Sequence, residues 1–537
     1  MHDSLVKEDF AALINGVIHR SQDGQEKFLG ALPTILPSLP PKILNNGLLQ
    51  FFIDWFSFDN LQIAKSLIST IKYFFDIEGA EIDLNLLMQY IKKALYANAV
   101  FLQHEIIELT QLMLTIFTPE TLDYKIIPEV DKIINKENID NSSVIICFQA
   151  YLASEVSEKT KFEIINNMSS IIKIAKSHFV HLTLLKNIVY FERIAADKSV
   201  LINELIIPCL SNEDFKVRCM AISSLSLVSE YFMNYCSNFS PLINLASDKN
   251  WHVRYSFART IWSVIQYAEK EQRISKSLLT LCSDTITEVK SAALESLAKC
   301  CPYVHENVLE VIPMIFDKSM RSPSTEVRIR GIQLWGSLLA AHPDAPFQAQ
   351  LNKSLILLKS VTVFDFVYQT LYYVVPHLKP GLISLDDVQK SFDTLFDNKD
   401  KPDKIIDAIN VATVYVNDSH LKDYCPYLVT KVKPLLRSPV YAVRCEAGNF
   451  FIDGTANFGW EWAKEYFIDE FLDMLRSGNI PLKTTAMRTA AALLCIEHSD
   501  DIQAEISEIM NDFAESDSEI IKLNTEMCLH QLQQRSD

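Results

Sequence analysis

Two pairs of side chains stand close enough in this sequence to suggest chemistry. His178 and His181 are three residues apart, which on a helix would bring two imidazoles to one face, as in a zinc site. No third ligand follows nearby, so we interpret both as structural or surface histidines and expect no metal ion. Cys300 and Cys301 are adjacent, and we interpret them as buried thiols rather than nucleophiles.

Other catalytic arrangements are excluded over much of the chain. The sequence has no glycine between Gly79 and Gly331, whereas P-loops, dinucleotide-binding turns and nucleophile elbows all need glycines. The carboxylates are spread out, and we expect no catalytic residue, no cofactor and no enzyme. The acidic residues near the end of the sequence lack the spacing of a calcium loop and are interpreted as a solvated face: Asp500, Asp501, Asp512, Glu515 and Asp517.

Composition limits the partners and the compartment. The chain of 537 residues has a net charge of −17, so its surface should repel nucleic acid. Its 11 cysteines include no CxxC pair, which is typical of free thiols in a reducing compartment. No apolar run is long enough to span a membrane, and charged residues occupy the start of the chain, where a signal peptide needs an apolar run. We expect a cytoplasmic protein and leave the nucleus open as a second compartment.

A repeated pattern organises the chain. A Val followed by Arg or Lys recurs, with a turn residue before it and a small residue four positions after it. The clear copies have their Val at Val217, Val253, Val289, Val327 and Val443. The gaps are 36, 36, 38 and 116 residues, and the last equals three steps of about 39. Weaker copies continue the phase at Ile63, Val144, Val180, Leu482 and Ile521.

This period is typical of paired-helix units of the HEAT or armadillo type. Apolar residues at spacings of three and four form a stripe after Val217, Val253 and Val289. A single helix pair cannot bury such a face, but a stack of pairs can. The sequence predicts an all-α fold, a right-handed α-solenoid of about fourteen HEAT repeats of paired antiparallel helices. We expect one solenoid over 1–537, divergent over 1–195 and clear over 196–537.

The cation after each Val has two interpretations. These residues are Arg218, Arg254, Lys290, Arg328 and Arg444. A row of cations along one edge could bind phosphate or an acidic peptide. Alternatively, each cation could pair with an acid or a carbonyl of the adjacent repeat's turn and tie the repeats together. We favour this inter-repeat structural role, because one cation per repeat is what stacking requires.

Trp251 and Tyr441 stand at predicted turns, away from the apolar stripes. Exposed aromatic side chains at turns are good anchors for a partner, because they bury a large area at a low cost in conformational entropy. The alternative is that each ring packs against the neighbouring turn. We favour partner binding for both.

Three segments resemble a known family. The segment 248–255, DKNWHVRY, resembles the Trp-x-Val-Arg-Tyr turn in the scaffold (A) subunits of protein phosphatase 2A. The segment 440–447, VYAVRCEA, looks like a second turn of that family, and 458–463, FGWEWA, is similar to its Phe-Gly-x-Glu-Trp-Ala. The resemblance extends over a little more than half of the chain.

The resemblance implies a solenoid that carries no active site and acts as a monomeric scaffold within a heterotrimer. Turns of its C-terminal repeats would hold a Ser/Thr phosphatase catalytic subunit, here at Val440, Tyr441, Leu482 and Lys483. Turns of its N-terminal and middle repeats would hold an exchangeable B-type regulatory subunit, here at Asp214, Phe215, Trp251 and His252.

The sequence departs from that family at several points. Residues 400–405 read DKPDKI where a second Trp-x-Val-Arg turn is expected, and His252 replaces the usual Arg. The repeat count is also one short of the family's usual number. The alternative is a nuclear transport receptor of the importin-β type, also an acidic HEAT solenoid, for which a net charge of −17 would favour basic cargo. An enzyme on an α/α architecture is the least favoured reading.

Overall fold

The computed structural model of the chain describes residues 83–135, 137–236, 238–268, 272–343, 364–378, 383–398, 400–477, 479–496, 500–516 and 518–536, with a few isolated residues before residue 83. Within these ranges every regular element is a helix and no strand occurs, so the predicted all-α class is confirmed. Contacts divide the chain into two compact units, 1–281 and 282–537. The division at residue 195 stays a sequence-based prediction.

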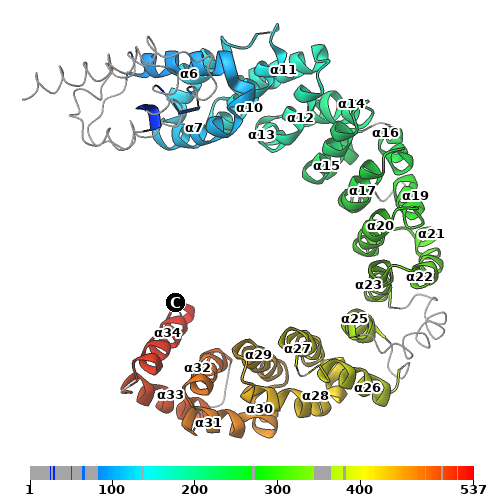
Figure 1. Cartoon of the computed structure of the whole chain (residues 1–537), viewed down its shortest axis with the longest axis vertical. Coiled ribbons are helices and arrows are strands. Elements are labelled where there is room, and N and C mark those ends of the chain that lie inside the picture. Colours follow the sequence, from blue (N-terminus) through cyan, green and yellow to red (C-terminus); the bar gives the residue numbers. More distant parts are fainter. Residues whose placement is uncertain are drawn as a thin grey trace, which may run out of the picture. The chain divides into compact units, whose positions relative to one another are not determined.

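In unit 1, residues 1–281, short and long helices follow one another in pairs (Figure 1). Helix α10 packs against α7, α11 and α12, then α12 packs against α15, and α15 against α17. Their bounds are α6 Leu84–Asn98, α7 Gln103–Ile116, α8 Pro119–Thr121, α9 Ile127–Asp131, α10 Ile139–Leu152, α11 Glu158–Ile174, α12 His178–Lys186, α13 Ile188–Ile194, α14 Ile207–Leu210, α15 Phe215–Tyr235, α16 Ser240–Asn244, α17 Trp251–Thr260, α18 Trp262–Ile265 and α19 Gln272–Leu281.

Unit 2, residues 282–537, repeats the arrangement: α20 packs against α23, α27 against α29, α29 against α32 and α32 against α34. Its helices are α20 Thr287–Cys300, α21 Glu306–Leu309, α22 Ile312–Met320, α23 Thr325–Ala341, α25 Phe364–Gln369, α26 Leu385–Phe396, α27 Pro402–Val416, α28 Cys425–Val432, α29 Tyr441–Phe458, α30 Trp460–Tyr466, α31 Ile468–Ser477, α32 Ile480–Leu493, α33 Asp500–Ala514 and α34 Glu519–Ser536. Two 3₁₀ segments, η9 Ser419–Tyr424 and η10 Lys433–Arg437, flank α28.

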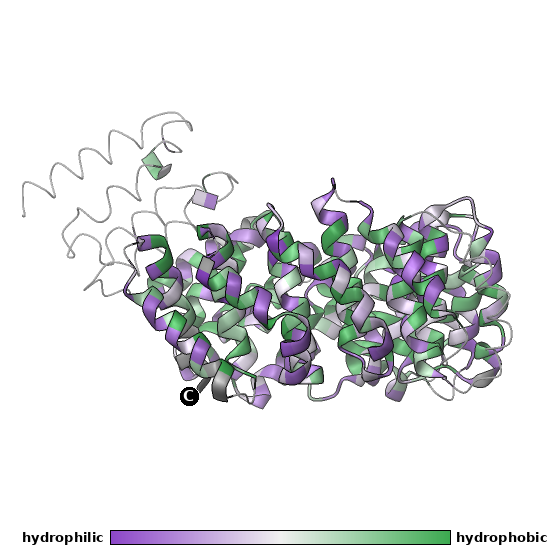
Figure 2. Cartoon of the chain, turned by 90° about the horizontal axis from the view of Figure 1, so that it is seen from below, coloured by the Kyte–Doolittle hydropathy of each residue, from purple (hydrophilic) through white to green (hydrophobic). Residues whose placement is uncertain are grey.

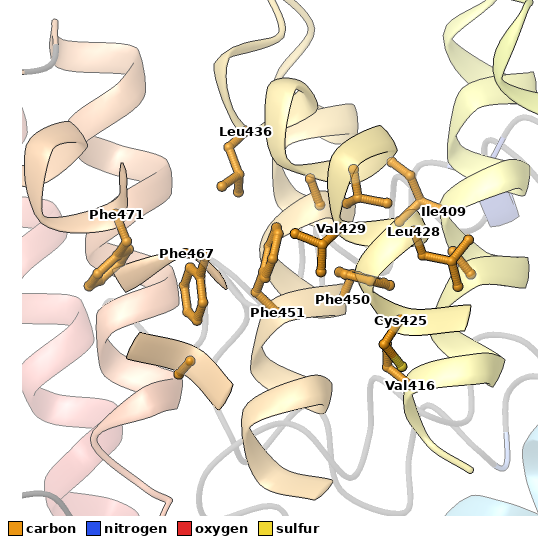
Figure 3. Packing of buried hydrophobic residues seen from close by; sticks show 14 of the residues in the cluster. Ile409, Val416, Cys425, Leu428, Val429, Leu436, Phe450, Phe451, Phe467 and Phe471 are labelled. Carbon is orange, nitrogen blue, oxygen red and sulfur yellow. The ribbon is translucent and has the colours of Figure 1, made fainter. Parts of the chain in front are cut away.

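The apolar stripes named from the sequence form the core. On α15 the stripe residues are all buried: Val217, Ala221, Leu225, Val228 and Phe232. Most helices carry both hydrophobic and hydrophilic residues, as amphipathic helices do (Figure 2). In unit 2, Phe450 and Phe451 of α29 pack edge to face, and Phe451 stacks on Phe467 with ring centroids 4.6 Å apart (Figure 3). Within each unit, apolar side chains of these helices are therefore buried, as a serial stack requires.

A helix break interrupts one apolar run. The sequence is largely apolar from Val308 to Phe316, but α21 ends at Leu309 and α22 begins at Ile312. Pro313 stands in the first turn of α22. Proline has no N–H to donate and its ring collides with the carbonyl of the preceding turn, so a helix starts there more easily than it continues.

Candidate protein-docking turns

The repeated Val sets the start of a helix in every clear repeat. Helices α15, α17, α20, α23 and α29 each begin two residues before that Val. The residue five positions before the Val accepts a hydrogen bond from the backbone N–H two residues further on, at 2.8 to 3.3 Å. These acceptors are Asn212, Asp248, Asp284, Ser322 and Ser438. The same local turn therefore presents the first helical residue at each start.

The residues predicted to face a regulatory subunit come together at the starts of α15 and α17. The Trp251 and His252 rings stack with centroids 3.8 Å apart, and His252 stacks on Phe215 at 5.9 Å. Trp251 is 37% exposed. Asp214 instead caps α15, where its carboxylate accepts from the N–H of Lys216 at 2.6 Å. We call Phe215, Trp251 and His252 the Trp251 surface.

The residues predicted to face a catalytic subunit lie at the starts of α29 and α32. Tyr441, the first residue of α29, is 49% exposed. The Arg444 guanidinium lies 5.6 Å from its ring centroid. The interaction of the Arg488 guanidinium with Tyr441 raises the pKa of that guanidinium. Two cations of the same unit, Arg444 and Arg488, thus interact with Tyr441.

The other three residues of this set are less exposed. Val440 is half-buried and lines a cavity of about 480 Å³ with Ile405 and Leu435. Leu482 is half-buried against the core of unit 2. The Lys483 ammonium lies 5.1 Å from the centroid of the Phe513 ring. We call Val440, Tyr441, Leu482 and Lys483 the Tyr441 surface.

Four of the five repeated cations bond to their own turn in the same way. Each arginine donates from Nη1 to the carbonyl six residues before it, at 2.6 to 2.8 Å. These pairs are Arg218 with Asn212, Arg254 with Asp248, Arg328 with Ser322, and Arg444 with Ser438. Lys290, half-buried at the fifth position, has no ion-pair partner among the described residues. A lysine cannot form the two-pronged contact of a guanidinium.

Arg218, Arg444 and Arg328 also reach the next turn, each with a different partner. Arg218 forms a bidentate ion pair with Asp248 at 2.8 and 3.0 Å, and both side chains are almost fully buried. Arg444 donates to the Thr485 hydroxyl at 3.0 Å and to the Pro481 carbonyl at 3.3 Å. Arg328 lies over the Phe366 ring, 5.1 Å from its centroid.

Sequence reasoning missed two features of these turns. Asp248 was not named as the partner of Arg218, although a polar residue stands five positions before the Val in every clear repeat. Phe364, the first residue of α25, was also missed. It occupies the position of Trp251 and Tyr441, and the Lys404 ammonium lies 4.2 Å from its ring centroid. Phe366 stands 39 residues after Val327, at the position where the repeat period predicts the Val. Phe364, two residues earlier, could have been located from that position.

The cysteines, histidines and acidic residues singled out in the sequence form no reactive site in the described residues. Cys300 and Cys301 are fully buried, and burial raises the pKa of the Cys301 thiol to about 12. His181 bonds through Nδ1 to the Ser177 carbonyl at 3.1 Å, beside the start of α12. Asp517 lies outside the described residues. Over the described ranges, no three His, Cys, Asp or Glu side chains gather as metal ligands, and no helix is long and apolar enough to cross a membrane.

Comparisons with known proteins bear on the fold. The sequence matches no protein-family description and no curated protein. The structure is similar to that of Kap121p bound to Pho4p, with a TM-score of 0.52 and 15% identity over 97% of this chain. It is also similar to yeast importin-beta, Kap95p, with a TM-score of 0.54 and 12% identity over 98% of this chain. The chain spans 56% of the length of that Kap121p and 68% of that Kap95p.

At such low identity the likeness shows a shared fold. The named structures are of a karyopherin and an importin-beta. These neighbours place the helix pairs of this chain in the same α-solenoid fold as the HEAT-repeat karyopherins.

Proposed function

We propose that this chain is a non-catalytic docking scaffold that holds different proteins on the Trp251 surface and on the Tyr441 surface. The observation that best supports this proposal is that Trp251 and Tyr441 are exposed. They occupy the same position in two repeats, and each of these repeats has a full apolar stripe inside. Rings that are not needed for the core are available to a partner. The row of arginines would then be the device that keeps successive turns aligned.

Both rings are held in place before any partner arrives. The Trp251 ring stacks on His252, and Tyr441 interacts with Arg444 and Arg488. A side chain that is already ordered loses little conformational entropy on binding, and aromatic residues in this state often dominate interface energies. Two separate surfaces on one chain would raise the effective concentration of one bound protein near the other.

The first candidate is a scaffold of the phosphatase 2A A-subunit type, with a catalytic subunit on the Tyr441 surface and a regulatory subunit on the Trp251 surface. Support comes from the turn sequences at 248–255 and 440–447, whose exposed rings start α17 and α29. We place this candidate first because a fold alone is shared by unrelated functions, whereas a site is specific.

The second candidate is a transport receptor of the importin-β type that carries basic cargo. The solved structures favour it, since Kap121p and yeast importin-beta share the fold. A net charge of −17 also suits basic partners.

Affinity purification of the full chain followed by mass spectrometry separates the two candidates. Recovery of a Ser/Thr phosphatase catalytic subunit, lost with Tyr441→Ala, supports the first. Binding to the small GTPase of nuclear transport, with no phosphatase recovered, supports the second. Tyr303→Ala is the matched control, because Tyr303 is 48% exposed in the same unit but lies outside the helix starts. Recovery of neither protein contradicts both candidates.

A further inference from the structure

An open groove lies at the far end of α29 from Tyr441. It has a volume of about 820 Å³ and is bounded by η9, the start of α28, the last residue of α29 and helix α30. Helix α29 has 18 residues, so it separates the groove from the Tyr441 surface by about 27 Å. The groove is therefore a separate surface within unit 2.

Aromatic side chains line one wall of the groove. Phe458, Trp462 and Tyr466 are spaced four residues apart and are all half-buried. The ring centroids of Phe458 and Trp462 are 5.9 Å apart, and those of Trp462 and Tyr466 are 5.4 Å apart. An edge of the Trp462 indole packs on Gly454, where any larger residue would collide with it. This packing fixes the ring while the groove remains open beside it.

The start of α30 depends on an unusual backbone. Gly459 has φ +84°, a value that other residues rarely adopt. This conformation ends α29 and lets α30 begin with Trp460, whose side chain is buried. Trp460 thus anchors the helix, and Trp462, two residues later, points to another face.

The charged residues around the groove leave an excess of negative charge. Lys464 pairs with Glu461 at 2.9 Å, so these two charges compensate each other. The remaining charged residues that line the groove are Lys422, Asp423 and Glu465. Neither of these two carboxylates forms an ion pair within the described part of the chain. Aromatic faces carry partial negative charge and attract cations. A carboxylate attracts the same cation by its own charge.

We propose that this groove binds a lysine or arginine side chain of a basic protein segment. The aliphatic stem of that side chain would lie along the Trp462 and Tyr466 rings, and its charge would lie near Asp423 and Glu465. An acidic or phosphorylated segment would meet like charge at the same place. This inference rests on the second candidate function, a receptor for basic cargo, and names a place where a basic segment would bind. It uses neither the Trp251 surface nor the Tyr441 surface, so variants of the groove test it apart from those two surfaces.

The test is fluorescence anisotropy of a fluorescein-labelled decalysine peptide titrated with the full chain, with a decaglutamate peptide as the opposite-charge probe. The double variant Asp423→Lys/Glu465→Lys should weaken decalysine binding about tenfold or more. Glu508→Lys/Glu526→Lys is the matched control. It changes net charge equally at exposed positions of α33 and α34, and it should weaken binding less than about twofold.

Two substitutions of Trp462 test the aromatic wall. Trp462→Leu should weaken decalysine binding about fivefold, whereas Trp462→Phe, which keeps a ring, should retain most of it. Circular dichroism melting curves identify any variant that has lost its fold. Equal weakening by both charge-reversal pairs, stronger binding of decaglutamate, or equal binding by the leucine and phenylalanine variants would overturn the inference.

Discussion

The starts of α15 and α29 share the Val-Arg pattern, but each is linked in a different way to the start of the helix that packs beside it, α17 or α32. In the first, the guanidinium of Arg218 meets the carboxylate of Asp248. In the second, the guanidinium of Arg444 meets a hydroxyl and a carbonyl, so its charge has only neutral acceptors at this link. The pattern Val-Arg therefore fixes the bonds within a turn, while the next turn decides how the charge is balanced.

The exposed rings differ in the same way. Trp251 is supported by other rings, His252 and then Phe215. Tyr441 is supported by two cations, Arg444 and Arg488. The Tyr441 surface thus carries positive charge beside its ring. A partner with acidic residues suits this surface.

The largest effect is expected for Asp248→Ala. It leaves the buried Arg218 charge without its carboxylate, which should lower the free energy of unfolding by about 3 kcal/mol. Urea denaturation followed by circular dichroism measures the change. Asp248→Asn is the control: it keeps an acceptor for Arg218 and for the N–H of Asn250, so it should cost less. A loss below about 1 kcal/mol for the alanine variant would show that the ion pair contributes little.

A smaller effect is expected for Thr485→Val, the matched change at the link between the starts of α29 and α32. Valine keeps the volume but removes the hydroxyl that accepts from Arg444 at 3.0 Å. Arg444 keeps its bonds to the Ser438, Pro439 and Pro481 carbonyls, so the loss should be about 1.5 kcal/mol in the same urea assay. A loss as large as that of Asp248→Ala would remove the distinction between the two turns.

The smallest effect is expected for Lys290→Arg. This change introduces a guanidinium at the one clear repeat that has no arginine after its Val. It should raise the free energy of unfolding of unit 2 by less than about 1 kcal/mol. The urea midpoint should rise slightly. Lys318→Arg on the exposed side of α22 makes the same chemical change away from a turn and should leave the midpoint unchanged. Destabilisation by Lys290→Arg would mean that this turn cannot accommodate the bonds seen in the other four.

Periodicity predicted the local structure well because it depends only on nearby residues. The spacing of Val217, Val253 and Val289 predicted helices, and each helix begins two residues before its Val. The stripe residues that follow are buried. The break before Ile312 could also have been predicted, because Pro313 is visible in the sequence and cannot continue a helix.

Contacts between turns could not be predicted in the same way. Arg218 and Asp248 are 30 residues apart, and their contact depends on how one helix pair stacks on the next. The partner of Arg328 is the Phe366 ring instead of an acid. Phe366 belongs to the following repeat, which lacks the Val-Arg pattern. The groove beside Trp462 arises from three segments between Lys422 and Tyr466, which no local pattern connects. The assignment of partners to the two surfaces came from resemblance alone, and it stays a proposal.

The central claim is that the Trp251 and Tyr441 surfaces hold different proteins, and it is tested most directly by measuring the affinity of each purified partner for two variants of the full chain. Tyr441→Ala should weaken one partner about tenfold or more and leave the other within about twofold, and Trp251→Ala should do the reverse. Tyr303→Ala and Tyr267→Ala, which remove similarly exposed rings outside the helix starts, should change neither affinity. Equal losses for both partners in both variants, or no loss in either, would contradict the account.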